Sequence, residues 1–339
     1  MKKSTVILLI IATSLVVLGC VVFGCAVIMM NGDLAKMGTN KHETNGYDIS
    51  EEFHSIRVDT DTADIELIPS DDGKCSVVCV ERIHAKHNVS VEDGVLCIKL
   101  VDTRRWYEYI GIGFNGSPSI KVYIPAGEYG SLTVKASTGA TEIPKDFGFE
   151  SMDITASTGL IKSSASVKGA VNIKASTGSV SLENVSVGSL DISVSTGKVT
   201  VTGNCEGDMS IGVSTGRIRL SDLNCKNFSS TGSTGDITLA RVEVAEKLYI
   251  KRSTGDVELE RTEAADMTVI TDTGDVTLES SDAERISITT DTGDVEGSLL
   301  TEKIFVVNTD TGRKDVPSTT SGGRCEITTD TGDIEITIG

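Results

Sequence analysis

Apolar residues occupy alternate positions in a short unit that recurs along most of this chain. Eleven Ser-Thr-Gly or Asp-Thr-Gly triplets, here called corners, have glycines 19 or 20 residues apart, from Gly139 to Gly332. Seven residues before the glycine the residue is apolar in all eleven units, and five before it is Val or Ile in ten. Two residues after the glycine, nine of the eleven are again Val or Ile. This alternation predicts a half-buried β-strand on each side of every corner.

The constant period predicts how the units associate. Burying about five apolar side chains gives one unit roughly 8–15 kcal/mol, but ordering each of its residues costs about 1.5 kcal/mol. One unit therefore cannot fold alone, whereas stacked units bury each other's faces and pair their strands. We expect an all-β, parallel β-solenoid of about 11–12 coils over residues 131–339. The alternative, an antiparallel sandwich of short hairpins, gives no reason for so constant a period.

The N-terminus predicts one transmembrane helix. Residues from Thr5 to Met30 carry no charge, and 26 helical residues span about 39 Å, enough for a bilayer core of about 30 Å. Lys2 and Lys3 favour a cytoplasmic N-terminus, which places the rest of the chain outside the cytoplasm. Residues 1–30 are thus expected to be a signal anchor in the cell membrane. A cleaved signal peptide and a lipoprotein are alternatives, the second because Val17-Leu18-Gly19-Cys20 resembles a lipobox.

Two less regular segments separate the anchor from the repeats. Residues 31–50 are rich in Gly and Asn, which is typical of a flexible linker. Residues 51–130 begin with a degenerate first coil in which Asp61-Thr62-Ala63 replaces the corner. Strands near residues 75–80, 95–101 and 119–124 then break the period. They predict a layer that caps the solenoid's first coil, because an open coil is an unpaired sheet edge.

The order of these features resembles a known family. An apolar N-terminus is followed by Phe53-His54-Ser55-Ile56-Arg57-Val58, then by Val122-Tyr123-Ile124-Pro125-Ala126-Gly127 and the tandem corners. Over about residues 51–339 this order is similar to the bacterial putative-adhesin family of tandem β-strand repeats, a domain of unknown function. The resemblance implies the architecture and a membrane-anchored protein. It supplies no catalytic residues.

Acidic residues are expected to form columns where the coils stack. Asp-Thr-Gly replaces Ser-Thr-Gly in the last four corners, and carboxylates one rung apart repel by about 0.9 kcal/mol even in a water-like dielectric. Such columns predict weak Ca²⁺ binding through oxygen ligands. The alternative is a set of solvated turns in which each Asp caps its own corner. The candidate ligands are Asp272, Asp275, Asp291, Asp294, Asp310, Asp330 and Asp333. An aspartic protease is disfavoured, because Asp-Thr-Gly here is one variant of a repeated corner.

One segment gathers much of the chain's aromatic content. It is a candidate binding surface for a glycan or a partner protein, since Trp, Tyr and Arg dominate binding hot spots. The alternative is a lid that closes the end of the solenoid. Its residues are Arg104, Arg105, Trp106, Tyr107, Tyr109 and Phe114.

The cysteines suggest two further features. Cys205 and Cys225 lie one coil apart, so their Cα atoms are expected within disulfide range, although stacked free thiols fit equally well. Cys75, Cys79, His84 and His87 form a compact group that is reminiscent of a zinc site. The spacing between its Cys and His pairs is too short for a zinc finger, so strand core followed by a polar hairpin is the favoured interpretation.

Charge and composition narrow the function. Acidic residues outnumber basic ones 49 to 31, for a net charge of −18, which disfavours nucleic acid and anionic lipid as partners. The eleven coils contain no histidine, and their acidic residues repeat instead of converging. We therefore expect a non-enzymatic, membrane-anchored adhesin or cell-envelope scaffold with no cofactor apart from Ca²⁺. A carbohydrate-active β-helix enzyme is one alternative. End-to-end self-assembly is the other, because Asp333 to Ile338 is expected to form an uncovered last coil.

Overall fold

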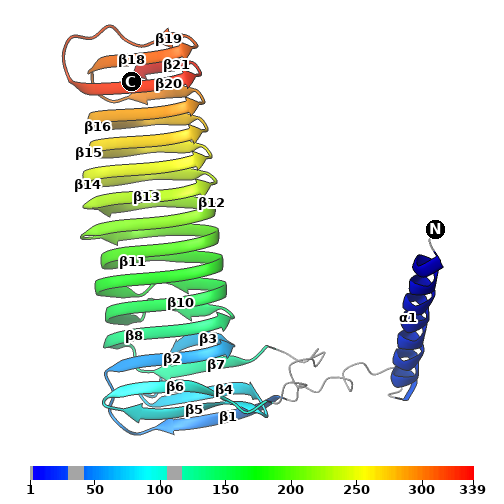
Figure 1. Cartoon of the computed structure of the whole chain (residues 1–339). Helices are drawn as coiled ribbons and strands as arrows, with labels where there is room; N and C mark the ends of the chain where they lie inside the picture. The colour runs from blue at the N-terminus through cyan, green and yellow to red at the C-terminus, as the bar shows by residue number, and fades with distance from the viewer. Residues whose placement is uncertain (1–2, 30–41, 105–116) are drawn as a thin grey trace.

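The computed structural model describes residues 3–29, 42–104 and 117–339. Its one described helix, α1 (Lys3–Met29), precedes a long rod of strands (Figure 1). Within α1, the segment Ile7–Cys25 is long and apolar enough to cross a membrane, and none of it is buried. A signal sequence has the same properties. The helix therefore agrees with the predicted apolar span.

The strands divide into an N-terminal group and the coils. The N-terminal group is β1 (His42–Ile49), β2 (Ser55–Thr62), β3 (Asp64–Pro69), β4 (Cys75–Arg82), β5 (Ala85–Glu92), β6 (Val95–Asp102) and β7 (Ser119–Ile124). The coils begin with β8 (Gly127–Thr138), β9 (Thr141–Ile143), β10 (Phe147–Ser163), β11 (Ser166–Cys205), β12 (Asp208–Cys225), β13 (Asn227–Thr234) and β14 (Ile237–Thr254). They continue with β15 (Val257–Thr273), β16 (Val276–Thr292), β17 (Val295–Leu299), β18 (Lys303–Thr311), β19 (Lys314–Asp315), β20 (Gly323–Thr331) and β21 (Ile334–Ile338).

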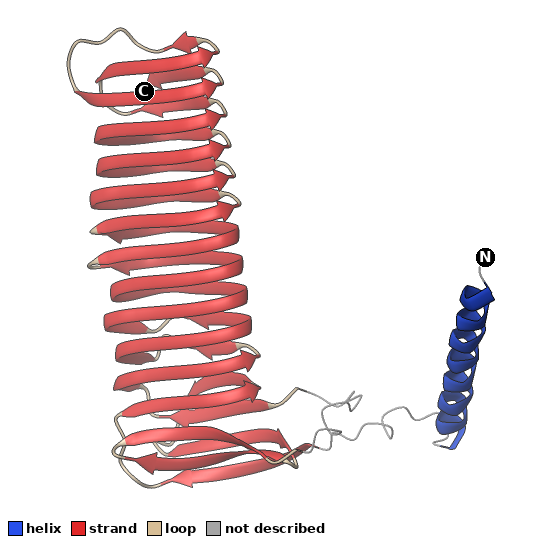
Figure 2. Ribbon diagram, in the orientation of Figure 1, coloured by secondary structure: helices blue, strands red, loops and turns tan. Residues whose placement is uncertain are grey.

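Parallel, in-register pairing joins each coil to the next. Thr158 aligns with Thr177 and Gly159 with Gly178, and the same match of corner to corner recurs along the rod. The strands lie one above another with the corners along one side (Figure 2). The predicted parallel β-solenoid is confirmed, and the antiparallel sandwich is wrong for the coils.

The core runs along the inside of the rod. The residue seven before the corner glycine is buried in ten of the eleven units, and Phe305 is the half-buried exception. The buried residues at this position are Leu132, Met152, Val171, Leu190, Met209, Phe228, Leu248, Met267, Ile286 and Cys325. The inward positions inferred from the alternation therefore form one continuous apolar column.

The N-terminal strands extend both faces of the solenoid. On one face β2 lies in parallel between β8 and β6, and β5 adds an antiparallel strand beyond β6. On the other face β3 pairs in parallel with β7, and β4 and β1 follow as antiparallel strands. Thr62 aligns with Thr138, which places Ala63 at the position of a corner glycine. This cap closes the first coil with antiparallel pairs.

Strand β1 corrects the boundary expected for the linker. Residues 42–49, expected to be flexible, pair with β4 over their whole length, from His42 opposite Arg82 to Ile49 opposite Cys75. The segment has few apolar residues, but backbone pairing with an exposed strand edge needs few, and Tyr47 packs against the core. The linker assignment is therefore wrong for residues 42–49. Residues 30–41 lie outside the described part of the chain.

The last two coils are stacked out of sequence order. Strand β20 pairs with β16 on one side and with β18 on the other. Strand β21 pairs with β17 over its whole length and, on its other side, with β19 at Ile334 and Glu335. The C-terminal coil is thus inserted below the coil that precedes it in sequence (Figure 1). The expectation that Asp333 to Ile338 is an uncovered last coil is wrong. The end of the rod is formed by β18 and β19, here called the terminal rung.

Candidate functional site

The aspartates that follow the corner glycines form a hydrogen-bonded ladder. The backbone N–H of Asp275 donates to Asp256 Oδ1 at 3.0 Å, and the N–H of Asp294 donates to Asp275 Oδ1 at 2.9 Å. The N–H of Asp333 then donates to Asp294 Oδ1 at 2.7 Å. The order follows the inserted coil, because Asp333 lies on the rung next to Asp294. One oxygen of these carboxylates therefore already has a backbone partner.

The ladder ends on a charged pair. The backbone N–H of Arg313 donates to Asp333 Oδ1 at 2.8 Å, and its guanidinium Nη2 contacts Asp333 Oδ2 at 2.7 Å. The backbone hydrogen bond and then the guanidinium lower the pKa of Asp333. Residues 313 and 333 follow consecutive corners and lie on adjacent rungs in either order of the last coils, whereas Asp333 reaches Asp294 only because those coils are exchanged.

The other acidic column lies just before the corner threonines. Threonines 273, 292, 331 and 311 align in that spatial order. The preceding carboxylates, all solvent-exposed, therefore follow one another as Asp272, Asp291, Asp330 and Asp310. The structure thus brings the seven predicted Ca²⁺ ligands to one side of the rod, in two columns. Calcium binding by these columns stays a prediction.

The expected aromatic surface lies mostly outside the described residues. Arg105, Trp106, Tyr107, Tyr109 and Phe114 are among residues 105–116. Arg104 is described, and its Nη2 lies 2.5 Å from Asp102 Oδ2 and 3.6 Å from Asp61 Oδ2. Both carboxylates belong to the cap, so the segment begins beside the first coil.

Cys205 and Cys225 are both free and buried. Their neighbours Asn204 and Asn224 are in register, which places the thiols on adjacent rungs as expected. Side chains of in-register parallel strands point the same way, so their Cβ atoms stay about 4.8 Å apart, beyond the roughly 3.8 Å typical of a disulfide. The structure therefore lacks the predicted disulfide, and burial raises the pKa of Cys225 to about 12.

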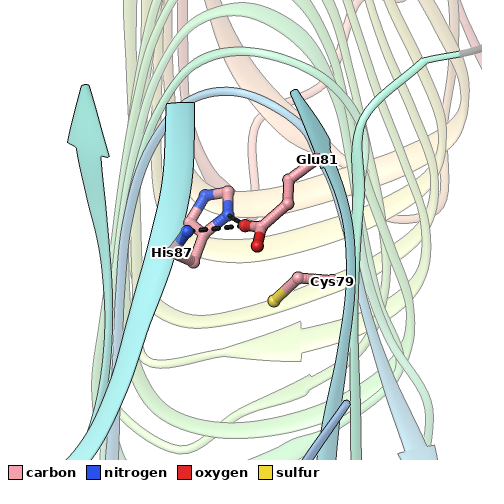
Figure 3. A group of neighbouring side chains, drawn as sticks. All are labelled: Cys79, Glu81 and His87. Carbon is pink, nitrogen blue, oxygen red and sulfur yellow. Dashed lines mark hydrogen bonds and ion pairs between the residues drawn. The ribbon is translucent and has the colours of Figure 1, made fainter. Parts of the chain in front are cut away.

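A buried cluster in the cap brings together Cys79, Glu81 and His87 (Figure 3). Cys79 and Glu81 are two residues apart on β4 and therefore face the same side of the strand. His87 comes from β5, which is joined to β4 by a tight turn at residues 83–84. Cys75 lies at the other end of β4, and His84 lies in the turn. The structure therefore keeps two of the four residues first considered for zinc and adds Glu81.

Hydrogen bonds fix the buried cluster from two sides. The Glu81 carboxylate accepts from Asn45 Nδ2 at 2.7 Å and from the backbone N–H of His87 at 2.5 Å. The His87 ring bonds through Nδ1 to Glu81 Oε2 at 2.8 Å and through Nε2 to Thr60 Oγ1 at 2.9 Å. Burial, with a smaller effect from Glu81, raises the pKa of the Cys79 thiol to about 12. Asn45 lies on β1, the strand that the sequence did not predict.

Two adjoining grooves lie along the side of the last coils. One has a volume of about 480 Å³ and the other about 640 Å³, and Arg285 and Arg324 line both. Arg285 Nη2 donates to Asp266 Oδ2 at 2.7 Å, and Arg324 Nη2 contacts Glu326 Oε2 at 2.9 Å. Tyr249 adds an aromatic ring to the smaller groove. This surface combines an aromatic side chain with paired charges across several coils.

The repeats and the cap together match one family model, Toastrack DUF4097, over residues 53–243 and 223–339. The chain belongs to the Toastrack DUF4097 family. No curated protein matches the sequence. The family assignment confirms the resemblance seen in the corners and in the two flanking motifs.

Several solved structures are similar to this Toastrack chain. A putative adhesin from Bacteroides fragilis is 14% identical, with a TM-score of 0.32, over 88% of this chain and 99% of that one. A putative lipid binding protein from Parabacteroides distasonis is 15% identical, with a TM-score of 0.34, over 88% and 98%. A putative cell adhesion protein from Clostridium sporogenes is 9% identical, with a TM-score of 0.25, over 88% and 100%.

Some site residues of this Toastrack protein could be predicted from the sequence and others could not. The acidic columns follow from the repeat alone, because the same position recurs in each unit. Glu81 was missed although a signal existed, since it continues the inward alternation of Val77 and Cys79 on β4. The grooves had no signal, because Tyr249 and Arg324 are far apart in sequence and belong to no motif.

Proposed function

We propose that this protein is a non-enzymatic rod, anchored in the cell membrane by α1, which binds a glycan or a protein of the cell envelope outside the cytoplasm. The observation that carries the proposal is the pair of grooves on the stacked coils, with Tyr249 and the charged pairs along them. An aromatic ring beside paired charges suits a ligand with both apolar faces and polar edges, as sugars and peptides have. The apolar segment Ile7–Cys25 supports anchoring.

The acidic corners favour binding over catalysis. A glycan-cleaving enzyme needs two carboxylates placed around one bond. Here the carboxylates of Asp256, Asp275 and Asp294 accept backbone hydrogen bonds from the next coil in a regular ladder. Repetition with a constant partner indicates a structural role for these residues.

A binding screen tests the proposal. The full chain in detergent is exposed to arrays of cell-wall glycans and to surface proteins, with and without calcium. We expect binding that falls at least tenfold in Tyr249→Ala, whereas Tyr123→Ala, in the cap, leaves it unchanged. Glycan cleavage by the wild-type chain, or binding that ignores Tyr249, contradicts the proposal.

The predicted aromatic surface has its own test in the same screen. Replacing Trp106 and Tyr107 with Ser is expected to abolish binding without unfolding if the segment contacts the ligand. Loss of the β-sheet circular dichroism signal instead assigns the segment to closing the rod.

A second candidate function is end-to-end self-association, and the terminal rung favours it. Within the described residues β18 pairs with β20 alone, so one edge of β18 presents unpaired backbone groups. Ile304 and Val306 on this strand are 47% and 46% exposed. An edge of this kind accepts a strand from another chain, and a second copy of this protein would extend the rod.

Sedimentation of the full chain in detergent tests this second function. We expect concentration-dependent dimers that Val306→Lys abolishes, because a charge on the edge blocks strand addition. Leu160→Lys is the matched control, since Leu160 is 43% exposed but lies on β10, away from the end. Strict monomers at all concentrations contradict self-association.

A further inference from the structure

The buried cluster of Cys79, Glu81 and His87 has the composition and spacing of a metal centre. One ligand atom from each residue lies within 4.8 Å of the other two. Cys79 and Glu81 are 0% exposed and His87 is 4% exposed. A thiol, an imidazole and a carboxylate are the three donor types that zinc takes from proteins. Buried ionisable groups of this kind are rare unless they pair or coordinate a metal.

Hydrogen bonds from neighbouring residues hold His87 Nε2 and Glu81 Oε1, the atoms that point away from the centre of the cluster. Thr60 Oγ1 bonds His87 Nε2, and Asn45 Nδ2 bonds Glu81 Oε1. These contacts turn His87 Nδ1 and Glu81 Oε2 toward the cluster. Metal-binding histidines almost always have their second ring nitrogen held in this way, and metal-binding carboxylates are likewise hydrogen-bonded.

Cys79 is the residue that favours a metal site over a simple pair of Glu81 and His87. Glu81 and His87 satisfy each other without it, and among the described residues the Cys79 sulfur has no hydrogen-bond partner. A thiol turned toward two polar groups, yet bonded to neither, is accounted for by a third partner that accepts all three ligands.

We propose that Cys79 Sγ, His87 Nδ1 and Glu81 Oε2 bind one Zn²⁺ ion. On binding, the thiol loses its proton and His87 is held as the neutral ring with its proton on Nε2, which donates to Thr60 Oγ1 and leaves the Nδ1 lone pair for the ion. The thiolate and the carboxylate together then balance the two charges of the ion. Ligand atoms around tetrahedral zinc lie roughly 3.3–3.8 Å apart, so the Nδ1 to Oε2 separation opens by roughly 0.5–1 Å.

A small cavity lined by two of the three ligands, Glu81 and His87, offers room for a fourth, solvent ligand. It has a volume of about 20 Å³ and is lined by Glu81 and His87 together with Asp61, Arg82 and Arg104. That volume holds about one water molecule, and three protein ligands with one solvent ligand are a common zinc arrangement.

The site joins strands from both faces of the cap. Its ligands come from β4 and β5, and the residues that orient them come from β1 and β2. Zinc would therefore stabilise the layer that closes the first coil. This role is independent of the ligand that the grooves bind.

Metal analysis of the full chain in detergent tests the proposal. After incubation with ZnCl₂ and desalting, we expect about one zinc per chain, and at least a tenfold loss of retained zinc in Cys79→Ser and His87→Gln. Cys97→Ser and His84→Gln are matched controls that keep the metal. Loading the wild-type chain with Co²⁺ should produce the thiolate-to-cobalt charge-transfer absorption, a readout that needs no variant to fold.

Two outcomes overturn the proposal. One is a wild-type chain that retains no zinc and shows no thiolate-to-cobalt absorption, which leaves the cluster as a closed Glu81–His87 hydrogen-bonded pair. The other is zinc that is retained equally by folded Cys79→Ser and His87→Gln chains, which places the metal elsewhere.

Discussion

Single aspartates at the corners stabilise the stack through the backbone of the next coil. The Asp294 carboxylate accepts the N–H of Asp333 at 2.7 Å, and the Asp333 carboxylate accepts the N–H of Arg313. The lowered pKa of Asp333 means that its carboxylate contributes stability above the unfolded-state pKa. That contribution is lost as the pH falls through the folded-state pKa. The repeat predicted columns of carboxylates, and stacking decided that those of the ladder have backbone donors.

Asp294→Ala is expected to lower the free energy of unfolding by about 1 kcal/mol, because it removes one hydrogen bond to a backbone N–H. Asp294→Asn keeps the accepting oxygen and relieves repulsion between neighbouring carboxylates, so it should be as stable as the wild type. Chemical denaturation measures both. Asp291→Ala, in the exposed column, is the control and should change stability by less than about 0.5 kcal/mol. Equal losses in Asp291→Ala and Asp294→Ala would refute the ladder.

Calcium binding by the acidic columns is tested through the melting temperature. Millimolar Ca²⁺ is expected to raise it, because the ion neutralises carboxylates that lie one rung apart. The double variant Asp272→Asn, Asp291→Asn should lose this rise while keeping the ladder intact. An unchanged melting temperature in the wild type at millimolar calcium rules the site out.

The corner is the element that every coil shares, and it sets the register between stacked coils. Gly216 has a φ of 142°, and a Cβ there would overlap the carbonyl oxygen of Gly197 on the coil below. Ala63 is accommodated because it lies on the first coil, where no corner glycine lies beneath it. Glycine is therefore required both by the local backbone and by the close approach of stacked corners.

Gly216→Ala should cost more than about 3 kcal/mol of unfolding free energy, since strain at the corner and overlap with the next coil act together. Gly212→Ala is a matched control in the same strand. A Cβ at Gly212 meets its nearest neighbours at 3.9 Å, so this change should cost less than about 1 kcal/mol. Thermal and chemical denaturation provide the comparison, and similar costs at the two positions would show that the corners do not pack as described.

The exchanged order of the last two coils follows from how well the strand after each corner, β21 or β19, can pair and bury apolar side chains. Strand β21 offers buried Ile334 and Ile336, whereas β19 has only two residues and places exposed Lys314 opposite Ile334. A weak second strand costs least at the end of the rod, where only one side needs a partner. The stronger coil therefore occupies the internal position.

Paired truncations in the two coils reveal their order. Ile327 is fully buried between Ile288 and Val307, so Ile327→Ala should cost about 2–5 kcal/mol. Val307 is only partly buried, and Val307→Ala should cost less than half as much. If the coils stacked in sequence order, Val307 would be internal and Ile327 terminal. A larger loss at Val307 than at Ile327 would therefore disprove the insertion.

At the scale of the whole molecule, the rod and the apolar helix have separate sources of stability. The rod buries one continuous core, whereas none of the Ile7–Cys25 segment is buried. A helix with this composition needs a membrane or detergent around it. The net charge of −18 favours solubility for the remainder of the chain.

Deleting residues 1–30 should therefore release the chain from the membrane fraction and leave its β-sheet circular dichroism and melting temperature within about 2 °C of the full chain in detergent, since no core residue is lost. Fractionation and thermal denaturation measure these effects. A large drop in melting temperature would mean that the helix packs against the rod.

The sequence by itself determined the coil and its inward face. Residues such as Ile192 and Val199 alternate with polar neighbours, and a period of two on both sides of a fixed corner permits only one buried face. The constant spacing then required each coil to match the next. These properties are local or strictly repeated, so one unit contains the information for all of them.

Only the tertiary structure decided which strands became neighbours where the repeat weakens. β1 pairs through backbone groups that every sequence carries, so its eight residues gave no apolar signal. Glu81 and His87 meet Asn45 and Thr60 because four strands converge in the cap. The exchange of the last two coils depends on the difference between two stacking free energies, and near-identical units make both orders compatible with the same alternation.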